Sequence, residues 1–376
     1  MVKKKSIFPL TKLSDVVSMK SGESITAERI TSEGKFPCFG GNGLRGYTTT
    51  FTHDGSYTLV GRQGALCGNV TFVSGRFYAS EHAIVVTPKK ETDIKFVSYV
   101  LYDMNLNQYS ESSAQPGLSV KKLLELEYPI PKNKEEQTAI AEALSDVDSL
   151  ISSLQKLIEK KKAIKQGAMQ ELLTGKKRLP GFYGEWEHVK LKDIILDFIV
   201  PMRDKPKDLS GEIPWCRIED FNGKYLSKSK SGQGVTFDTV NRMNLKIFPK
   251  ETLIVSCSAY LGRCAIVKTE LITNQTFIGL VAKSNVSVEF LFYVMCKEEK
   301  NLNLLSSGTT ISYLSREQFE EYLIYIPKDL AEQQSIAQVL SDMDSAIEQL
   351  EKKLSKYQQI KQGMMQELLT GRIRLV

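Results

Sequence analysis

Two stretches of the chain carry the same hydrophobic pattern. Apolar residues recur at alternating steps of three and four over residues 144–158 and again over 340–354. Lys, Glu and Gln fill most of the other positions, and this arrangement is typical of a coiled coil. We therefore expect two long helices with the following core positions: Leu144, Val147, Ile151, Leu154, Ile158, Leu340, Met343, Ile347, Leu350 and Leu354.

Each helical stretch belongs to an internal repeat. Residues 130–179 and 326–375 align at a constant offset of 196 residues, with 29 identities in 50 positions. Pro131 and its copy prevent a helix from entering from the N-terminal side, and Gly175 and its copy are typical of helix ends. The first helix should therefore run from about residue 135 to about residue 174. Since this period is far longer than that of a solenoid, the chain consists of two large halves.

The two helices most simply pack on each other within the chain. An antiparallel arrangement relates the halves by a pseudo-twofold axis, and a short connection from the first helix to the second half favours it. Gly167 and Gly363 occupy matched positions inside the helices. We expect a close helix–helix approach or a slight bend at these glycines, because glycine otherwise destabilises a helix interior.

The blocks that precede the helices are expected to be α+β domains. Short apolar stretches between glycines in the first block predict twisted strands at 59–60, 70–73 and 83–86. Helical patterns follow at 94–106 and 119–126. The predicted organisation is a first domain at 1–130, a helix segment at 131–180, a second domain at 181–327 and a second helix segment at 328–376.

The second block repeats the architecture of the first more than its sequence. When Gly68 is aligned with Gly262, residues 256–259 replace 61–64, and 275–276 replace 81–82. The two blocks therefore share a fold but differ in their polar loop residues. This is the pattern expected of two domains that recognise different ligands.

Composition narrows the class of protein. The chain has 376 residues, 41% of them hydrophobic and 25% charged, as in a soluble globular protein of two or three domains. No apolar run approaches the ~18 residues of a membrane span, and no signal peptide is evident. Six cysteines without a CxxC pair indicate free thiols in the cytoplasm. The three histidines have no ligand spacing that predicts a structural zinc site, and a net charge of +6 permits binding to a polyanion.

One glycine motif could suggest a nucleotide cofactor. Residues 41–46 match G-x-G-x-x-G, but a dinucleotide-binding loop requires a preceding strand and a following helix. The residues that follow, Tyr47 to Phe51, are strand-like instead. We therefore interpret this motif as a turn-rich loop, and the chain carries no P-loop motif.

The helical repeats give the chain a resemblance to a known family. This resemblance rests on the motif Gln137-x-x-Ile-Ala-x-x-Leu-Ser-Asp-x-Asp and its copy from Gln333. It also rests on the two Met-Gln-Glu-Leu-Leu-Thr-Gly tails. Looser elements are Gly61-Arg62-x-Gly and Glu81-His82-Ala. The chain resembles the specificity (S) subunit of type I restriction–modification systems over essentially its whole length.

The resemblance implies a DNA-recognition subunit. Each block would be a target recognition domain that reads one half of a bipartite site in double-stranded DNA, and the two helices would set the spacing between the halves. Two methyltransferase (M) subunits would bind equivalent surfaces, and restriction (R) subunits would join the complex. The chain itself would be non-catalytic, without a bound metal or other cofactor, because S-adenosylmethionine, ATP and Mg²⁺ belong to the partner subunits.

Candidate DNA-contacting residues lie in the Gly-rich and inter-element stretches, where side chains reach outward. Several also have a structural interpretation: His82 as an interior histidine, Tyr260 as a packing residue, and Arg45 and Arg62 as partners of Glu33 or Asp54. The candidates are Asn42, Arg45, Arg62, Gln63, His82 and Gln115 in the first domain, and Arg203, Arg217, Ser258, Tyr260, Arg263, Gln275, Thr309 and Thr310 in the second.

The repeated tails are candidates for the M-subunit interface, because their identity exceeds what a helix end requires. The predicted interface residues are Met169, Leu172, Leu173, Met365, Leu368 and Leu369, with Gln137, Gln166, Gln333 and Gln362 on the outer helix faces.

Two other classes of function compete with this interpretation. A self-contained methyltransferase–nuclease requires a cofactor-binding motif that the sequence lacks. A coiled-coil scaffold leaves the two similar loop-rich domains unexplained, and a DNA-binding module without a restriction–modification role stays an alternative.

Overall fold

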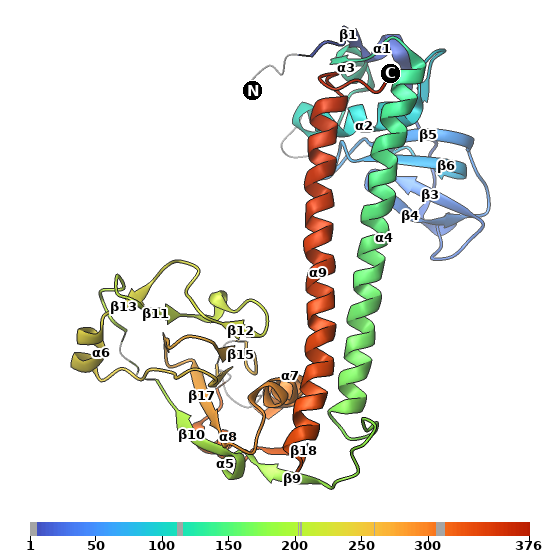
Figure 1. The fold of residues 1–376 in the computed structure, drawn as a ribbon. Coiled ribbons are helices and arrows are strands. Elements are labelled where there is room, and N and C mark those ends of the chain that lie inside the picture. Colours follow the sequence, from blue (N-terminus) through green and yellow to red (C-terminus); the bar gives the residue numbers. More distant parts are fainter. Residues whose placement is uncertain (1–5, 111–115, 202, 204, 259, 306–312) are drawn as a thin grey trace. The chain divides into compact units, whose positions relative to one another are not determined.

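The computed structural model describes residues 6–110, 116–201, 203, 205–258, 260–305 and 313–376 (Figure 1). The chain divides into two compact units, one of residues 1–156 with 351–376 and one of residues 157–350. Each unit contains one globular domain and one half of each long helix, α4 (Lys134–Leu172) and α9 (Leu330–Leu368). The two predicted helices are thus confirmed, and each contributes to both units.

The first unit contains a six-stranded sheet of order β2-β7-β5-β6-β3-β4. Neighbouring strands are antiparallel, except that β3 is parallel to β6. A smaller pair, β1 with β8, lies at the ends of the domain. The elements are β1 (Leu10–Lys12), α1 (Leu13–Val16), β2 (Val17–Ser21), η1 (Ala27–Arg29), β3 (Phe36–Gly40), β4 (Gly43–Thr48), β5 (His53–Gly61), β6 (Val70–Ala79), β7 (Ala83–Pro88), α2 (Ile94–Asp103), η2 (Leu106–Tyr109), α3 (Val120–Glu125) and β8 (Glu127–Pro129).

The second unit has a sheet of order β10-β17-β14-β15-β12, whose first four strands repeat β2-β7-β5-β6, while β12 adds a parallel strand beside β15. A three-stranded sheet, β13-β11-β16, matches β4, β3 and the end of β6 in the first unit, because β11 is parallel to β16 as β3 is to β6, and β13 is antiparallel to β11 as β4 is to β3. The elements are β9 (Trp186–Lys190), α5 (Leu191–Ile194), β10 (Ile195–Ile199), β11 (Ile213–Cys216), η3 (Ile218–Asp220), β12 (Tyr225–Leu226), β13 (Gly234–Val235), α6 (Phe237–Met243), β14 (Leu253–Ser256), β15 (Cys264–Val267), β16 (Ile272–Thr273), β17 (Phe277–Ala282), α7 (Val288–Leu305), α8 (Arg316–Glu320) and β18 (Leu323–Pro327).

The helix halves run antiparallel within each unit. In the first unit, Arg374 pairs with Glu136 at 2.8 Å and Lys361 with Asp148 at 2.6 Å. The second unit repeats both pairs with every residue displaced by 196 positions: Arg178 with Glu332 at 2.5 Å, and Lys165 with Asp344 at 2.5 Å. The α+β fold class and the antiparallel pairing predicted from the repeat are therefore confirmed.

The predicted core stripe follows the observed burial. Leu144, Leu154, Ile158, Leu340 and Ile347 are buried. The other predicted core positions are half-buried: Val147, Ile151, Met343, Leu350 and Leu354.

The matched glycines do not mark a close helix contact. A Cβ atom placed on Gly167 or Gly363 would meet no atom of the described chain within 4 Å. Both glycines lie on exposed positions of their helices. Of the two alternatives expected at these glycines, the close helix–helix approach is therefore wrong, because their helix face is open, and the slight bend stays a prediction.

The leucines of the repeated tails are core residues of the domains. Leu172 and Leu173 are 5% and 0% exposed and pack in the main core of the second unit, beside half-buried Met169. Met365, Leu368 and Leu369 occupy the same role in the first unit. These buried leucines offer no surface to a partner in the folded chain, so the interface predicted for them needs correction. Identical docking of each helix end into its domain explains the repeated sequence.

Two of the predicted outer-face glutamines are also buried. Gln137 is 2% exposed, and its amide accepts from Asp93 N and donates to Pro131 O, both at 2.9 Å. Gln333 repeats these bonds with Ser287 N and Pro327 O. They connect each helix start to its domain and face inward, whereas Gln166 and Gln362 are exposed as predicted.

Candidate nucleic-acid interface

Three loops of the first domain converge at one edge of its sheet. The β3–β4 turn at Gly41-Asn42 packs so closely on β5 that a Cβ atom on Gly61 would lie 2.0 Å from Gly41 O. The backbone N–H of Arg62 then donates to His82 O at 2.8 Å. These contacts bring four of the predicted first-domain residues, Asn42, Arg62, Gln63 and His82, to one place.

The side chains at this edge form a polar network. His82 Nδ1 lies 3.1 Å from Gln63 Oε1, and its Nε2 lies 3.2 Å from Glu81 Oε1. The side chain of His82 is 42% exposed, so it is not an interior histidine. Arg45 is exposed, and its side chain lies against Gly40.

The alternative ion pairs considered for the two arginines are not observed. Asp54 pairs with Arg76 at 2.8 Å. Among the residues that the structure describes, no ion pair joins Arg45 or Arg62 to Glu33 or Asp54. Arg45 is exposed and Arg62 is half-buried.

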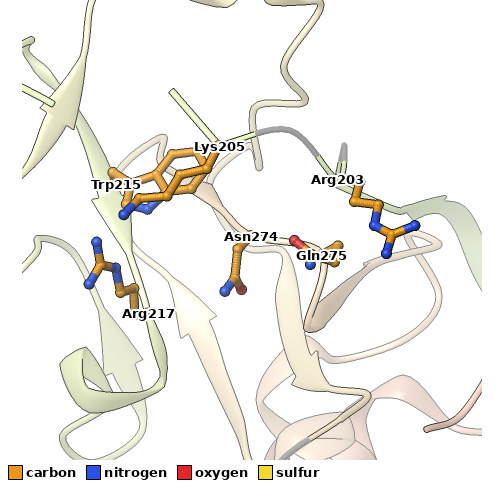
Figure 2. A pocket seen from close by; sticks show the side chains of 6 residues that line it. All are labelled: Arg203, Lys205, Trp215, Arg217, Asn274 and Gln275. Carbon is orange, nitrogen blue, oxygen red and sulfur yellow. The ribbon is translucent and has the colours of Figure 1, made fainter. Parts of the chain in front are cut away.

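The second domain has a basic cleft of about 330 Å³ (Figure 2). The sequence predicted three of its lining residues and missed three others. The missed Lys205 lies in a basic run and Asn274 precedes a predicted residue, whereas no local signal identified the buried Trp215. The cleft is lined by Arg203, Lys205, Trp215, Arg217, Asn274 and Gln275.

The three-stranded sheet of the second domain, β13-β11-β16, positions this cleft. Strands β11 and β16 are parallel, with Cys216 opposite Thr273, so Arg217 and Asn274 leave their strands at the same edge. Asp220 fixes the start of the following turn, because its Oδ2 accepts from Arg217 N at 2.7 Å. Burial raises the pKa of the Cys216 thiol to about 12, so the thiol next to Arg217 stays neutral.

Cationic side chains, amide side chains and the ring of Trp215 line the same cleft. Arg217 Nη1 lies 3.7 Å from Glu219 Oε1, a long and partly exposed ion pair that leaves most guanidinium donors available. The Oδ1 atom of Asn274 accepts from Thr276 Oγ1 at 2.5 Å, which directs the Asn274 side chain. These groups suit phosphate oxygens and base edges.

A second candidate loop of this domain carries an exposed aromatic residue. Tyr260 is 64% exposed and has a left-handed backbone with φ of 61°. The Arg263 guanidinium lies 4.8 Å from its ring centroid, as in a cation–π contact. Ser258 is half-buried and forms an isolated bridge with Tyr313, so its backbone is held in place.

Backbone hydrogen bonds confirm the loop alignment between the domains. Gly68 N donates to Gly61 O at 2.8 Å, as Gly262 N donates to Ser256 O at 2.9 Å. The bond from Arg62 N to His82 O is matched by a 2.9 Å bond from Cys257 N to Thr276 O. Leu118 N and Leu314 N likewise bond to Arg62 O and Cys257 O, each at 2.9 Å. The same backbone frame therefore presents different side chains in the two domains.

Some predictions remain without structural information. Gln115, Thr309 and Thr310 lie outside the described residues. In the part of the chain that the structure covers, no group of three His, Cys, Asp or Glu side chains could hold a metal ion. No described helix is long and apolar enough to cross a membrane.

The family model of the type I restriction modification DNA specificity domain matches the chain twice, at residues 9–166 and 183–362. The chain belongs to this family. Each match covers one globular domain with most of the long helix that follows it. The two specificity domains are thus the two halves defined by the sequence repeat.

Three similar proteins illustrate this relationship. The Type I restriction enzyme EcoprrI specificity subunit of Escherichia coli is 46% identical over 146 residues, which cover 38% of this chain and only 36% of that relative. A putative type I restriction enzyme MjaX specificity subunit of Methanocaldococcus jannaschii is 26% identical over 86% of this chain and 78% of its own length. The crystal structure of a type I restriction–modification system S subunit from M. genitalium shares the fold, with a TM-score of 0.73, 20% identity and coverage of 98% and 97% of the two chains.

Proposed function

We propose that this chain is the DNA sequence-recognition subunit of a type I restriction–modification complex. One specificity domain reads each half of a bipartite, asymmetric DNA site. The observation that carries the proposal is the common backbone frame of the two domains, which carries Arg62, Gln63 and His82 in one and, at the matched positions, buried Cys257 and half-buried Ser258 and Thr276 in the other. Two domains with the same loop backbone but different side chains can recognise two different half-sites.

The chemistry of the loops supports direct readout of DNA. Arginine pairs well with guanine O6 and N7, and Asn or Gln pairs with adenine N6 and N7. The second-domain cleft offers both kinds of group in Arg217, Asn274 and Gln275. Exposed Arg203 and Lys205 at the same cleft suit phosphate contacts, which position the duplex without specifying sequence.

The repeat also supports assembly with two equal partners. Similar helix segments, with Gln166 and Gln362 exposed at matched positions, give two methyltransferase subunits equivalent surfaces. Restriction subunits then complete a cytoplasmic complex. In this proposal the chain is non-catalytic, and S-adenosylmethionine, ATP and Mg²⁺ are bound by the partner subunits. The relatives' names, which call them specificity subunits of restriction enzymes, favour this assembly.

The test is to map methylated sites after co-expression of the chain with its methyltransferase subunit. We expect one bipartite motif. Replacement of Arg217 or Gln275 by alanine should relax only one half of the motif, and replacement of Arg62 or Gln63 only the other. Lys250, which is exposed and outside the cleft, provides a matched Lys250→Ala control that should leave the motif unchanged.

Two outcomes would overturn the proposal. One is a motif that stays unchanged in all four loop variants while each variant remains folded. The other is methylation or cleavage of DNA by the purified chain alone, which would indicate a self-contained enzyme. Stable sequence-specific binding without any methyltransferase partner would instead favour an independent DNA-binding module.

A further inference from the structure

The first unit also has a cleft, which lies beside strand β6. Its volume is about 240 Å³, and it combines aromatic rings with two lysines. Phe72 and Tyr102 are 36% and 61% exposed there. The cleft is lined by Val70, Phe72, Lys95, Ser98, Tyr99, Tyr102, Asp148 and Lys361.

The equivalent place in the second unit is covered by the chain itself. Phe72 lies opposite Thr58 in the β5–β6 pair, as Ile266 lies opposite Leu253 in the β14–β15 pair. In the second unit, β12 adds to this edge as a parallel strand, and Ile266 N donates to Lys224 O at 2.8 Å. Ile266 is consequently 0% exposed.

No described strand of the first unit takes the place of β12 at the same edge. Over the described residues, β3 pairs with β6 only at Tyr78 and Ala79, six and seven residues beyond Phe72. The edge near Phe72 therefore retains the capacity to accept another strand. An exposed aromatic side chain on an unpaired edge is a suitable place for strand addition.

The charge on the neighbouring helix is reversed between the units. In the second unit, Glu289 of α7 accepts from Lys224 Nζ at 2.9 Å and from the Tyr225 hydroxyl. Lys224 Nζ also donates to Ser341 Oγ of α9 at 2.9 Å. Lys95 of α2 takes the helix position of Glu289 in the first unit and donates to Ser145 Oγ at 2.5 Å. A segment that fits here should therefore carry a carboxylate where Lys224 stands.

We propose that the β6 edge of the first unit binds an extended segment of a partner protein. The segment adds as a parallel strand beside Phe72, places a carboxylate on Lys95 and sets an aromatic side chain next to it. The backbone of this segment follows the path that residues 224–226 take in the second unit, and an acidic residue stands at the position of Lys224. The proposal concerns a protein contact and does not depend on DNA recognition.

Two labelled peptides test the proposal against the full chain. One is Asn-Gly-Lys-Tyr-Leu-Ser-Lys, copied from residues 222–228, and the other carries Lys224→Glu. Fluorescence anisotropy should show that the acidic peptide binds about tenfold more tightly, since an attractive pair replaces a repulsive one. In the Lys95→Glu variant the preference should reverse. A scrambled peptide of the same acidic composition controls for the net positive charge of the chain.

Other variants distinguish the occupants. Phe72→Asp should abolish binding of both peptides, and Lys95→Met should remove the preference, with thermal unfolding used to check that each variant is folded. The proposal fails if neither peptide binds, or if Lys95→Glu leaves the preference unchanged. It also fails if duplex DNA displaces the acidic peptide, or if Phe72→Asp dissociates a homodimer, because the edge then serves DNA or a second copy.

Discussion

The carboxylate of Glu332 is completely buried and accepts hydrogen bonds from Nε and Nη2 of Arg178 at 2.5 and 2.7 Å. Trp186 Nε1 lies 3.3 Å from the same carboxylate. Glu136 and Arg374 form the same two-bond pair in the first unit, with distances of 2.8 Å. Each unit thus holds the start of one long helix against the segment that follows the other.

Removal of the arginine should leave a buried charge without its partner. We expect Arg178→Met to lower the free energy of unfolding by about 3 kcal/mol, in line with other broken buried pairs. Urea denaturation measures this loss. Adding Glu332→Gln should restore part of it, because a neutral amide needs less compensation.

A surface pair provides the control for this measurement. Arg316 and Glu320 pair at 2.7 Å with side-chain exposures of 50% and 28%, so Arg316→Met should cost less than about 1 kcal/mol. If Arg178→Met and Arg316→Met lower the free energy of unfolding equally, the buried pair stabilises the fold no more than the surface pair does.

The two helix glycines should be dispensable in the free chain. Because a Cβ atom on Gly167 or Gly363 meets nothing within 4 Å, alanine fits without strain at both positions. Each substitution should raise the free energy of unfolding by about 1 kcal/mol, the difference in helix propensity. The contrasting control is Gly175→Ala, which places a Cβ atom 3.3 Å from Trp186 at a φ of 68° and should destabilise. Destabilisation by Gly167→Ala would reveal a close contact after all.

The sequence was most informative where a pattern repeats. The a/d stripe, the offset of 196 residues and the caps at Gly175 and Gly371 locate both helices to within a few residues. The loop alignment on Gly68 and Gly262 also proved correct, because tight backbone hydrogen bonds require similar turn residues in both domains.

Tertiary packing decided what the sequence could not show. Gln137 lies between polar residues of the helix, and the apolar pair Leu172-Leu173 does not by itself show whether it faces a partner or a domain core. The basic cleft depends on the parallel pairing of β11 with β16, whose residues lie more than fifty positions apart in the chain. Trp215 therefore joined the site through topology alone.

The exposed carboxylate of Glu321 should make stability depend on pH in acid. Hydrogen bonds from Lys190 and Lys192 lower its pKa from 4.5 to about 2. Since the folded-state pKa is depressed, the contribution is present above 4.5 and is lost as the pH falls towards 2. In urea titrations the difference between the wild type and Glu321→Gln should be largest near pH 6 and should shrink below pH 4.5.

Salt gives the control for this pH dependence. The Glu321 side chain is 52% exposed, so 1 M NaCl should screen most of the difference at pH 6. A difference between the two proteins that stays constant from pH 6 to pH 3 at low salt would contradict the assignment.

Tyr260 should trade stability for DNA binding. An aromatic residue with a φ of 61° is strained, whereas asparagine tolerates this conformation well. We expect Tyr260→Asn to raise the free energy of unfolding by about 1 kcal/mol. If the exposed ring contacts a base or sugar, the same variant should lose about 1–3 kcal/mol of binding free energy in the assembled complex.

The conservative variant separates the two effects. Tyr260→Phe keeps the ring near Arg263 and the strained backbone, so it should retain both the stability and most of the DNA affinity of the wild type. Unfolding by urea and DNA titration of the complex measure the two quantities. A Tyr260→Asn variant that is more stable and binds DNA with unchanged affinity would show that the strain serves no contact with DNA.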